Sequence, residues 1–184
     1  MNYFELISIA LAFILLLPFT LVPWMLKKKS YPIDYYHDQI RVLKGYSQIN
    51  AFSVRGIRSH LILISESTLN LDYNELQAII AHEEGHIKLN HHVKMTLVMG
   101  IPIYTSLLLI IKGEVFFAIP ILLITLLAQK VISRRFELEA DRYALKTTSR
   151  DELASVISRY GERRSSLIST HPDVSTRLKN IGYS

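Results

Sequence analysis

Residues 72–86 read Asp-Tyr-Asn-Glu-Leu-Gln-Ala-Ile-Ile-Ala-His-Glu-Glu-Gly-His. The first four residues, Asp72 to Glu75, have the pattern of a capping box, which opens helices. Apolar side chains then recur at helical spacing, at Leu76, Ile79, Ile80 and Ile87. The stretch therefore predicts an amphipathic helix, on which His82 and His86 lie one turn apart and can reach the same tetrahedral metal ion.

Glu83 follows the first of these histidines and sits beside the expected metal without ligating it. A hydrolytic zinc site needs a carboxylate in this place to take a proton from water. The alternative for the motif is a polar helix face that carries two surface histidines.

A second stretch, residues 134–144, reads as a helix with Glu137 and Asp141 four positions apart. Like charges at that spacing disfavour a helix, unless each has a partner. We expect Glu137 to be the third metal ligand and Asp141 to accept the second ring N–H of a ligand histidine. The rival ligand Glu139 points about 200 degrees away around the helix. The alternative is a solvated acidic patch.

Two further histidines, His91 and His92, follow His86 by five and six residues. That spacing does not suit the same metal ion on one continuous helix. We therefore expect them at a wet helix end near a membrane.

Four stretches in this order resemble the integral-membrane gluzincin metallopeptidases, the group of the HtpX heat-shock peptidases and the Ste-type CAAX prenyl proteases. They are Asn50-Ala-Phe-Ser53, Glu75 to His86, Ser133-Arg-Arg-Phe-Glu-Leu-Glu-Ala-Asp141, and Thr170-His-Pro-Asp-Val-Ser-Thr-Arg177. The resemblance implies one Zn²⁺ on His82, His86 and Glu137, with Glu83 as the general base.

The resemblance also implies roles that spacing could not show. His171 and Arg177 would steady the oxyanion of the tetrahedral intermediate, since donors aimed at developing charge lower a barrier. Asn50, Ala51 and Phe52 would form an edge strand to which an extended substrate adds through main-chain hydrogen bonds. Without the resemblance, His171 reads as a turn residue, Arg177 as a surface charge and Asn50 as a turn residue.

The chain departs from this group at two places. Glu84 stands where relatives usually carry an apolar residue. The amino-terminal region contains one apolar span, where HtpX-like enzymes commonly have two.

Apolar residues make up 49% of the 184 residues, and they are clustered. Residues 3–26 carry a single charge, Glu5, and are long enough to cross a hydrocarbon core of roughly 30 Å. A signal peptide is the alternative, but the span is too long, lacks a basic start and has no small-residue cleavage pattern. We therefore expect a retained transmembrane anchor.

Two more apolar stretches, 95–111 and 115–128, are separated only by Lys112-Gly-Glu114. They predict a transmembrane helical hairpin inserted between the zinc motifs, with Pro102 and Pro120 as possible kinks. A hairpin returns the chain to the side it left, as the metal ligands before and after it require. A hairpin buried in a soluble core is the alternative.

Positive residues flank the spans on one side: Lys27, Lys28, Lys29, Lys88, Lys94, Lys130, Arg134 and Arg135. This bias predicts a multi-pass protein of the cell membrane whose catalytic part faces the cytoplasm. It also explains the net charge of +5 through attraction to the lipid bilayer, so we expect no nucleic-acid partner. The absence of cysteine excludes disulfides and thiolate ligands.

The predicted fold class is α+β, mainly helical, with a small β-sheet. Residues 57–65, especially 60–65, should pair with the Asn50 strand, and 31–44 could be a strand or a short helix. Residues 151–164 and 172–181 read as helices. We expect an anchor over 1–29, a metallopeptidase domain from 30–94 and 130–184, and a hairpin over 95–129.

These features predict a membrane-bound zinc endopeptidase that cleaves misfolded or membrane proteins. The alternatives are a processing protease for a specific peptide such as a prenylated one, a latent enzyme, and a silent sensor or scaffold with a zinc site. The sequence leaves the substrate, the cleavage preference and the oligomeric state open.

Overall fold

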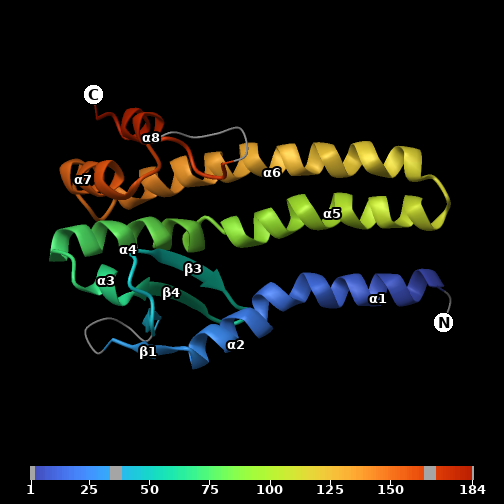
Figure 1. Ribbon diagram of the computed structural model, residues 1–184, viewed down its shortest axis with the longest axis horizontal. Helices are drawn as coiled ribbons and strands as arrows, with labels where there is room; N and C mark the ends of the chain where they lie inside the picture. The colour runs from blue at the N-terminus through green and yellow to red at the C-terminus, as the bar shows by residue number, and fades with distance from the viewer. Residues whose placement is uncertain (1–2, 34–38, 164–168, 184) are drawn as a thin grey trace.

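The computed structural model describes residues 3–33, 39–163 and 169–183. Three apolar helices extend toward one end of the molecule, and the sheet and the remaining helices gather at the other end (Figure 1). The long helices are α1 (Tyr3–Leu16), α5 (His91–Ile111) and α6 (Val115–Ala144). The predicted class, mainly helical with a small sheet, is confirmed.

The sheet has four strands in the order β1-β2-β4-β3. They are β1 (Ser30–Pro32), β2 (Ile40–Leu43), β3 (Ala51–Arg55) and β4 (His60–Ser65). β3 and β4 pair antiparallel, with Ala51 opposite Ile64, as predicted from the Asn50 stretch. The undecided segment 31–44 contains β1 and β2, while 34–38 lie outside the described residues. β3 therefore forms an edge of the sheet, directly after Asn50.

Helix α4 (Tyr73–Lys88) covers the sheet, after a one-turn helix α3 (Glu66–Leu69). Three residues of its predicted apolar stripe, Leu76, Ile80 and Ile87, are buried in one core with Val42, Ile62 and Ile64 of β2 and β4. The fourth, Ile79, lies outside this core and lines a cavity on the other face of the helix. This packing fixes which face of α4 turns away from the sheet. That outer face carries His82 and His86.

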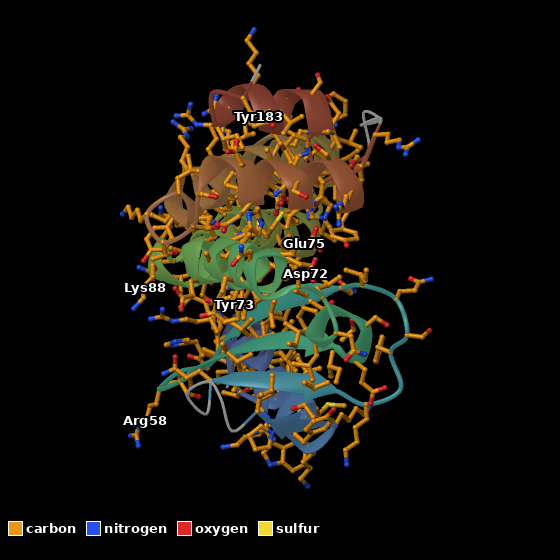
Figure 2. The ribbon with its side chains drawn as sticks, turned by 90° about the vertical axis from the view of Figure 1, so that its left-hand side faces the viewer. Arg58, Asp72, Tyr73, Glu75, Lys88 and Tyr183 are labelled. Carbon is orange, nitrogen blue, oxygen red and sulfur yellow. The ribbon has the colours of Figure 1, made fainter. Side chains whose placement is uncertain are left out.

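The predicted capping box at the start of α4 is wrong. Asp72 is the N-cap residue, but its side chain makes no capping hydrogen bond. Glu75 instead turns toward α7 (Arg150–Tyr160), where it accepts from Arg159 Nη1 at 2.6 Å and from Tyr160 at 3.3 Å (Figure 2). A charged donor on a neighbouring helix binds the carboxylate better than a backbone N–H at a solvated helix start.

Helices α4 and α6 approach closely at Gly85. A Cβ atom at this position would lie 3.0 Å from Ala140 Cα and 3.1 Å from Ala140 O. Only glycine allows the two backbones to come this near. The close approach brings the histidines of α4 to the carboxylates of α6.

Among the residues that the structure describes, three helical segments are long and apolar enough to cross a membrane: 4–28, 91–111 and 115–144. They indicate a membrane protein. Both hairpin helices continue through Pro102 and Pro120, and α1 contacts α5 through a bond of 2.9 Å between Ser8 Oγ and Tyr104 Oη. The first span is not one straight helix, because η1 (Leu17–Phe19) separates α1 from α2 (Leu21–Lys28).

The last helix, α8 (Val174–Asn180), presents Arg177 to the site. Its N-cap residue Asp173 accepts from the backbone N–H of Thr176 at 2.8 Å. Helix α7 and α8 pack together with α4 through a second core, of which Leu153, Ile157 and Ile181 are buried members. The carboxy-terminal helices thus cover the outer face of α4.

Candidate metal centre

Three potential ligands, His82, His86 and Glu137, converge between α4 and α6. The two Nε2 atoms are 3.2 Å apart, and the Glu137 carboxylate oxygens lie 3.5 Å from His82 Nε2 and 3.4 Å from His86 Nε2. Ligands at 2.0–2.1 Å around a tetrahedral zinc ion are separated by roughly 3.3 Å. The donor set therefore fits one face of a zinc tetrahedron, and two imidazoles with one carboxylate are donors that zinc accepts in hydrolytic sites.

A cavity of ≈ 310 Å³ opens over this face. Its lining includes His82, Glu83, Glu137, His171 and Arg177, and the structure thus brings the predicted chemical groups together. Glu83 is only 9% exposed and is not among the three convergent ligands. A carboxylate next to the ligands but outside their set can act on a water molecule in the cavity.

Asp141 lies behind the ligands and is fully buried. Its Oδ1 is 2.9 Å from His82 Nδ1, so His82 presents Nε2 to the metal position. Arg177 holds the same carboxylate with two bonds, from Nη2 at 2.6 Å and from Nε at 2.8 Å. Burial by itself lowers the pKa of His82, but hydrogen bonds to Asp141 and Glu137 outweigh it and raise this pKa to about 10. The site is therefore negative enough to hold a cation.

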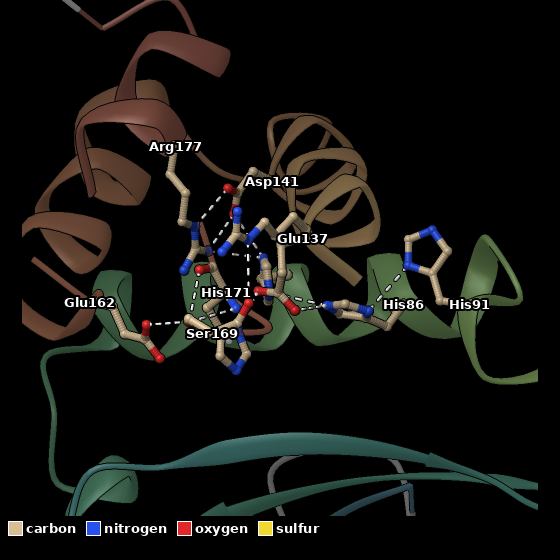
Figure 3. Close-up of polar contacts among 10 residues, drawn as sticks. His86, His91, Glu137, Asp141, Glu162, Ser169, His171 and Arg177 are labelled. Atoms are coloured by element: carbon tan, nitrogen blue, oxygen red, sulfur yellow. Dashed lines mark hydrogen bonds and ion pairs between the residues drawn. The ribbon is translucent and has the colours of Figure 1, made fainter. Parts of the chain in front are cut away.

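His171 reaches the centre from the segment before α8 (Figure 3). Its Nδ1 lies 3.2 Å from Glu137 Oε2, and its side chain is half exposed to the cavity. The hydrogen bond to Glu137 raises the pKa of His171. Ser169 donates to Glu162 at 2.6 Å and accepts from the His171 backbone N–H at 3.2 Å, which holds the backbone next to His171.

The prediction for His91 is wrong, because this residue is buried beside the ligands and not at a wet helix end. Its Nδ1 is 3.1 Å from His86 Nδ1, and its Nε2 is 3.1 Å from Glu139 Oε2. The ring also stacks on Phe136, with centroids 4.1 Å apart. Glu139, discarded as a ligand, thus supports a ligand through His91.

The physical reason is a break in the helix. α4 ends at Lys88, Asn90 has a φ of 57°, and α5 starts at His91, so the helical register is not continuous between His86 and His91. Counting residues along one continuous helix therefore misplaces His91. The left-handed preference of Asn was the only signal in the sequence.

The three residues predicted to bind substrate, Asn50, Ala51 and Phe52, do not all lie at the cavity. Asn50 and Ala51 line the cavity, whereas Phe52 packs with the buried residues on the other side of β3. Asn50 is fixed through its backbone N–H, which donates to Thr68 Oγ1 at 2.9 Å. Glu84 does not line the cavity.

Fold and site together define a class of protein. Its members have apolar helices that can span a membrane, and a candidate metal centre of two histidines and one glutamate. A further carboxylate, here Glu83, lies beside this centre and is not one of the three ligands. Within that class, the family model of Peptidase family M48 matches residues 25–184, and the chain belongs to this family. No curated protein matches the chain.

Among solved structures, the crystal structure of S. mikatae Ste24p is similar, with a TM-score of 0.68 and 19% sequence identity. The match covers 96% of this chain and 56% of the Ste24p chain. At this identity the likeness concerns the fold. The present chain therefore spans little more than half of the larger protein.

Proposed function

We propose that this protein is a membrane-bound, zinc-dependent endopeptidase. The observation that carries the proposal is the ligand geometry: three donors spaced as one face of a zinc tetrahedron, with Glu83 on the wall of the same cavity. Membership of Peptidase family M48 supports a metallopeptidase and implies a metal, usually zinc. His82, His86 and Glu137 would hold it.

When bound, zinc supplies a Lewis acid and makes water a nucleophile near neutral pH. Glu83 accepts the proton of the attacking water and delivers it to the leaving amine. His171 donates to the oxygen of the scissile carbonyl as negative charge develops there. Arg177 fixes Asp141 with Nε and Nη2, so its Nη1 group is the part that can face the substrate.

The substrate backbone adds to the free edge of β3. Ala51 begins this strand, and both it and Asn50 line the cavity. Binding through main-chain hydrogen bonds places little demand on side chains, which suits an endopeptidase acting on unfolded segments. Phe52 serves this strand by packing into the sheet.

The membrane arrangement supports substrates that are misfolded or membrane proteins, cleaved at the cytoplasmic face. The basic residues near the spans lie on the side of the metal centre, consistent with the positive-inside rule. Because α6 runs unbroken from the hairpin to Glu137, the proposed boundary at residues 129 and 130 divides one helix by its surroundings.

The test compares the wild-type protein with Glu83→Gln after purification in detergent. Both should contain about one zinc ion per chain, and only the wild type should cleave unfolded casein, with a loss in the variant of roughly 10²- to 10⁴-fold. Zinc without cleavage in both proteins would favour a scaffold or a latent enzyme. Absence of bound zinc would refute the metal centre.

A further inference from the structure

A second cavity, of ≈ 370 Å³, lies on another side of α4 and carries three cationic side chains. They are Arg55 at the end of β3, Arg58 in the β3–β4 turn and Lys88 at the end of α4. His60 completes the polar lining. Figure 2 shows Arg58 and Lys88 projecting on the same side of the molecule. We call this the basic pocket.

The charges of the basic pocket are largely uncompensated. Within the described part of the chain, no Asp or Glu lines it, and no ion pair involves its three cations. Arg55 donates to the carbonyl of Ile87 at 3.5 Å, so one cation partly serves the helix end. Burial, followed by the charges of Lys88 and Arg55, lowers the pKa of His60, and together they outweigh the opposing charge of the nearby Glu84, which does not line the pocket. The pocket is thus electropositive and has room for an anion.

The position of the basic pocket in the fold bears on which anion it binds. The backbone N–H of Ile57, in the β3–β4 turn, donates at 3.1 Å to the carbonyl of Phe19, the last residue of η1, which follows α1. Asn90, which also lines the pocket, directly precedes α5. The pocket therefore lies where two apolar helices enter the polar part of the molecule.

The turn itself has a membrane-facing character. Ile57 is 65% exposed at its tip, between Arg55 and Arg58. Further along α5, the apolar side chains of Leu97 and Ile101 are 55% and 62% exposed. An exposed apolar tip flanked by cations suits the boundary between hydrocarbon and phosphate headgroups.

We infer that the basic pocket binds the phosphate group of an anionic membrane lipid. Arg58 and Lys88 contact the phosphate from two sides, and Arg55 adds charge from below. The lipid ties the β3–β4 hairpin to the membrane, and with it the free edge of β3. The site is separate from the metal centre and does not depend on peptidase activity.

The experiment uses the full-length protein in a neutral detergent and titrates it by calorimetry with dihexanoyl phosphatidylglycerol, dihexanoyl phosphatidylcholine and inorganic phosphate. The wild type should bind the anionic phosphatidylglycerol at least roughly tenfold more tightly than the zwitterionic phosphatidylcholine. The triple variant Arg55→Gln, Arg58→Gln, Lys88→Gln should lose roughly 10- to 100-fold of this affinity. Its zinc content should be unchanged.

The matched control removes three other exposed cations, Lys27→Gln, Lys29→Gln and Lys44→Gln, and should change the affinity by less than about threefold. An equal loss in both triple variants, or no lipid preference in the wild type, would overturn the site. Inorganic phosphate binding as tightly as the lipid would overturn the membrane assignment. The single variant Arg58→Gln changes an exposed side chain and should therefore fold like the wild type. It should reduce the affinity for phosphatidylglycerol roughly fivefold.

Discussion

The two halves of helix α6 meet opposite surroundings. In the distal half, which begins at Val115, apolar side chains are exposed: Phe116 is 82% exposed and Ile124 is 65% exposed. In the proximal half, which ends at Ala144 beside the metal centre, charged side chains are buried: Glu137 is 9% exposed and Asp141 is 0% exposed. One helical period continues through both halves, so the difference comes from the surroundings: a set of polar partners around the proximal half, and the expected lipid around the distal half. The following changes test this contrast.

The largest effect should come from the buried charge of the proximal half. Asp141→Asn leaves the guanidinium of Arg177 without its carboxylate, and breaking a buried pair costs about 3–5 kcal/mol. Unfolding by denaturant in detergent measures it. Asp151→Asn, at an exposed position of α7, should stay within about 0.5 kcal/mol of wild type. Equal stability of the two variants would contradict the role of Asp141.

A charge placed in the distal half should be nearly as costly. Ile124→Arg puts an arginine near the centre of the apolar segment, for an expected insertion penalty of about 2.5–3.5 kcal/mol. Tyr73→Arg is the matched control, because Tyr73 is also 65% exposed but starts α4 in the polar part. An insertion reporter at the hairpin tip gives the penalty. A tolerated Ile124→Arg would mean that this face meets water.

The support behind His86 should matter for metal affinity. His91→Phe keeps the stacking on Phe136 but removes both ring nitrogens, which should weaken zinc binding roughly 10- to 100-fold. Competition with a fluorescent chelator measures the affinity. His92→Gln changes a histidine whose Nε2 contacts Ser53 and should leave the affinity nearly unchanged. If both variants bind zinc as the wild type does, His91 only fills space.

Two glycines compare the packing at the metal centre with the packing between the apolar helices α1 and α5. Gly85→Ala drives a Cβ against the backbone of Ala140 and should cost about 1–3 kcal/mol. Gly100→Ala meets only the flexible end of Leu15, at 2.9 Å, and should cost less. Thermal unfolding of both variants gives the order, and the reverse order would contradict the close approach of α4 and α6.

The smallest effect concerns the cap of α8. Hydrogen bonding to the backbone of Thr176 lowers the pKa of Asp173. A depressed folded-state pKa stabilises the protein above the unfolded value, near 3.9, and this contribution is lost as the pH falls through the folded value. Asp173→Ala should therefore cost about 1 kcal/mol at pH 7 and less below pH about 4. Unfolding curves at the two pH values test the difference, and a cost independent of pH would argue against the ionised cap.

The sequence predicted most of the elements because their signals are local. β-Branched residues between Gly and Ser located β4, and the uniform apolar runs located α5 and the first half of α6. The His82 to His86 spacing needs only one helical turn to bring two ligands together. Such features depend on residues a few positions apart.

The sequence could not predict partners that are far apart along the chain. Glu75 forms an ion pair with Arg159, 84 positions away, and not the predicted capping hydrogen bond. Arg177 likewise pairs with Asp141 across 36 positions. The resemblance placed Arg177 near the metal but did not give its partner. His91 was missed because one residue in the left-handed region, Asn90, breaks the helical register between His86 and His91.

The metal centre is attached to the hairpin in two mechanically different ways. Helix α6 is a single rod of 30 residues, about 45 Å long at 1.5 Å per residue, and it carries Glu137 rigidly. The two histidines lie on α4, which is separated from α5 by the break at Asn90. A displacement of the hairpin would therefore reach Glu137 along one continuous helix, whereas it would reach the histidines only across that break.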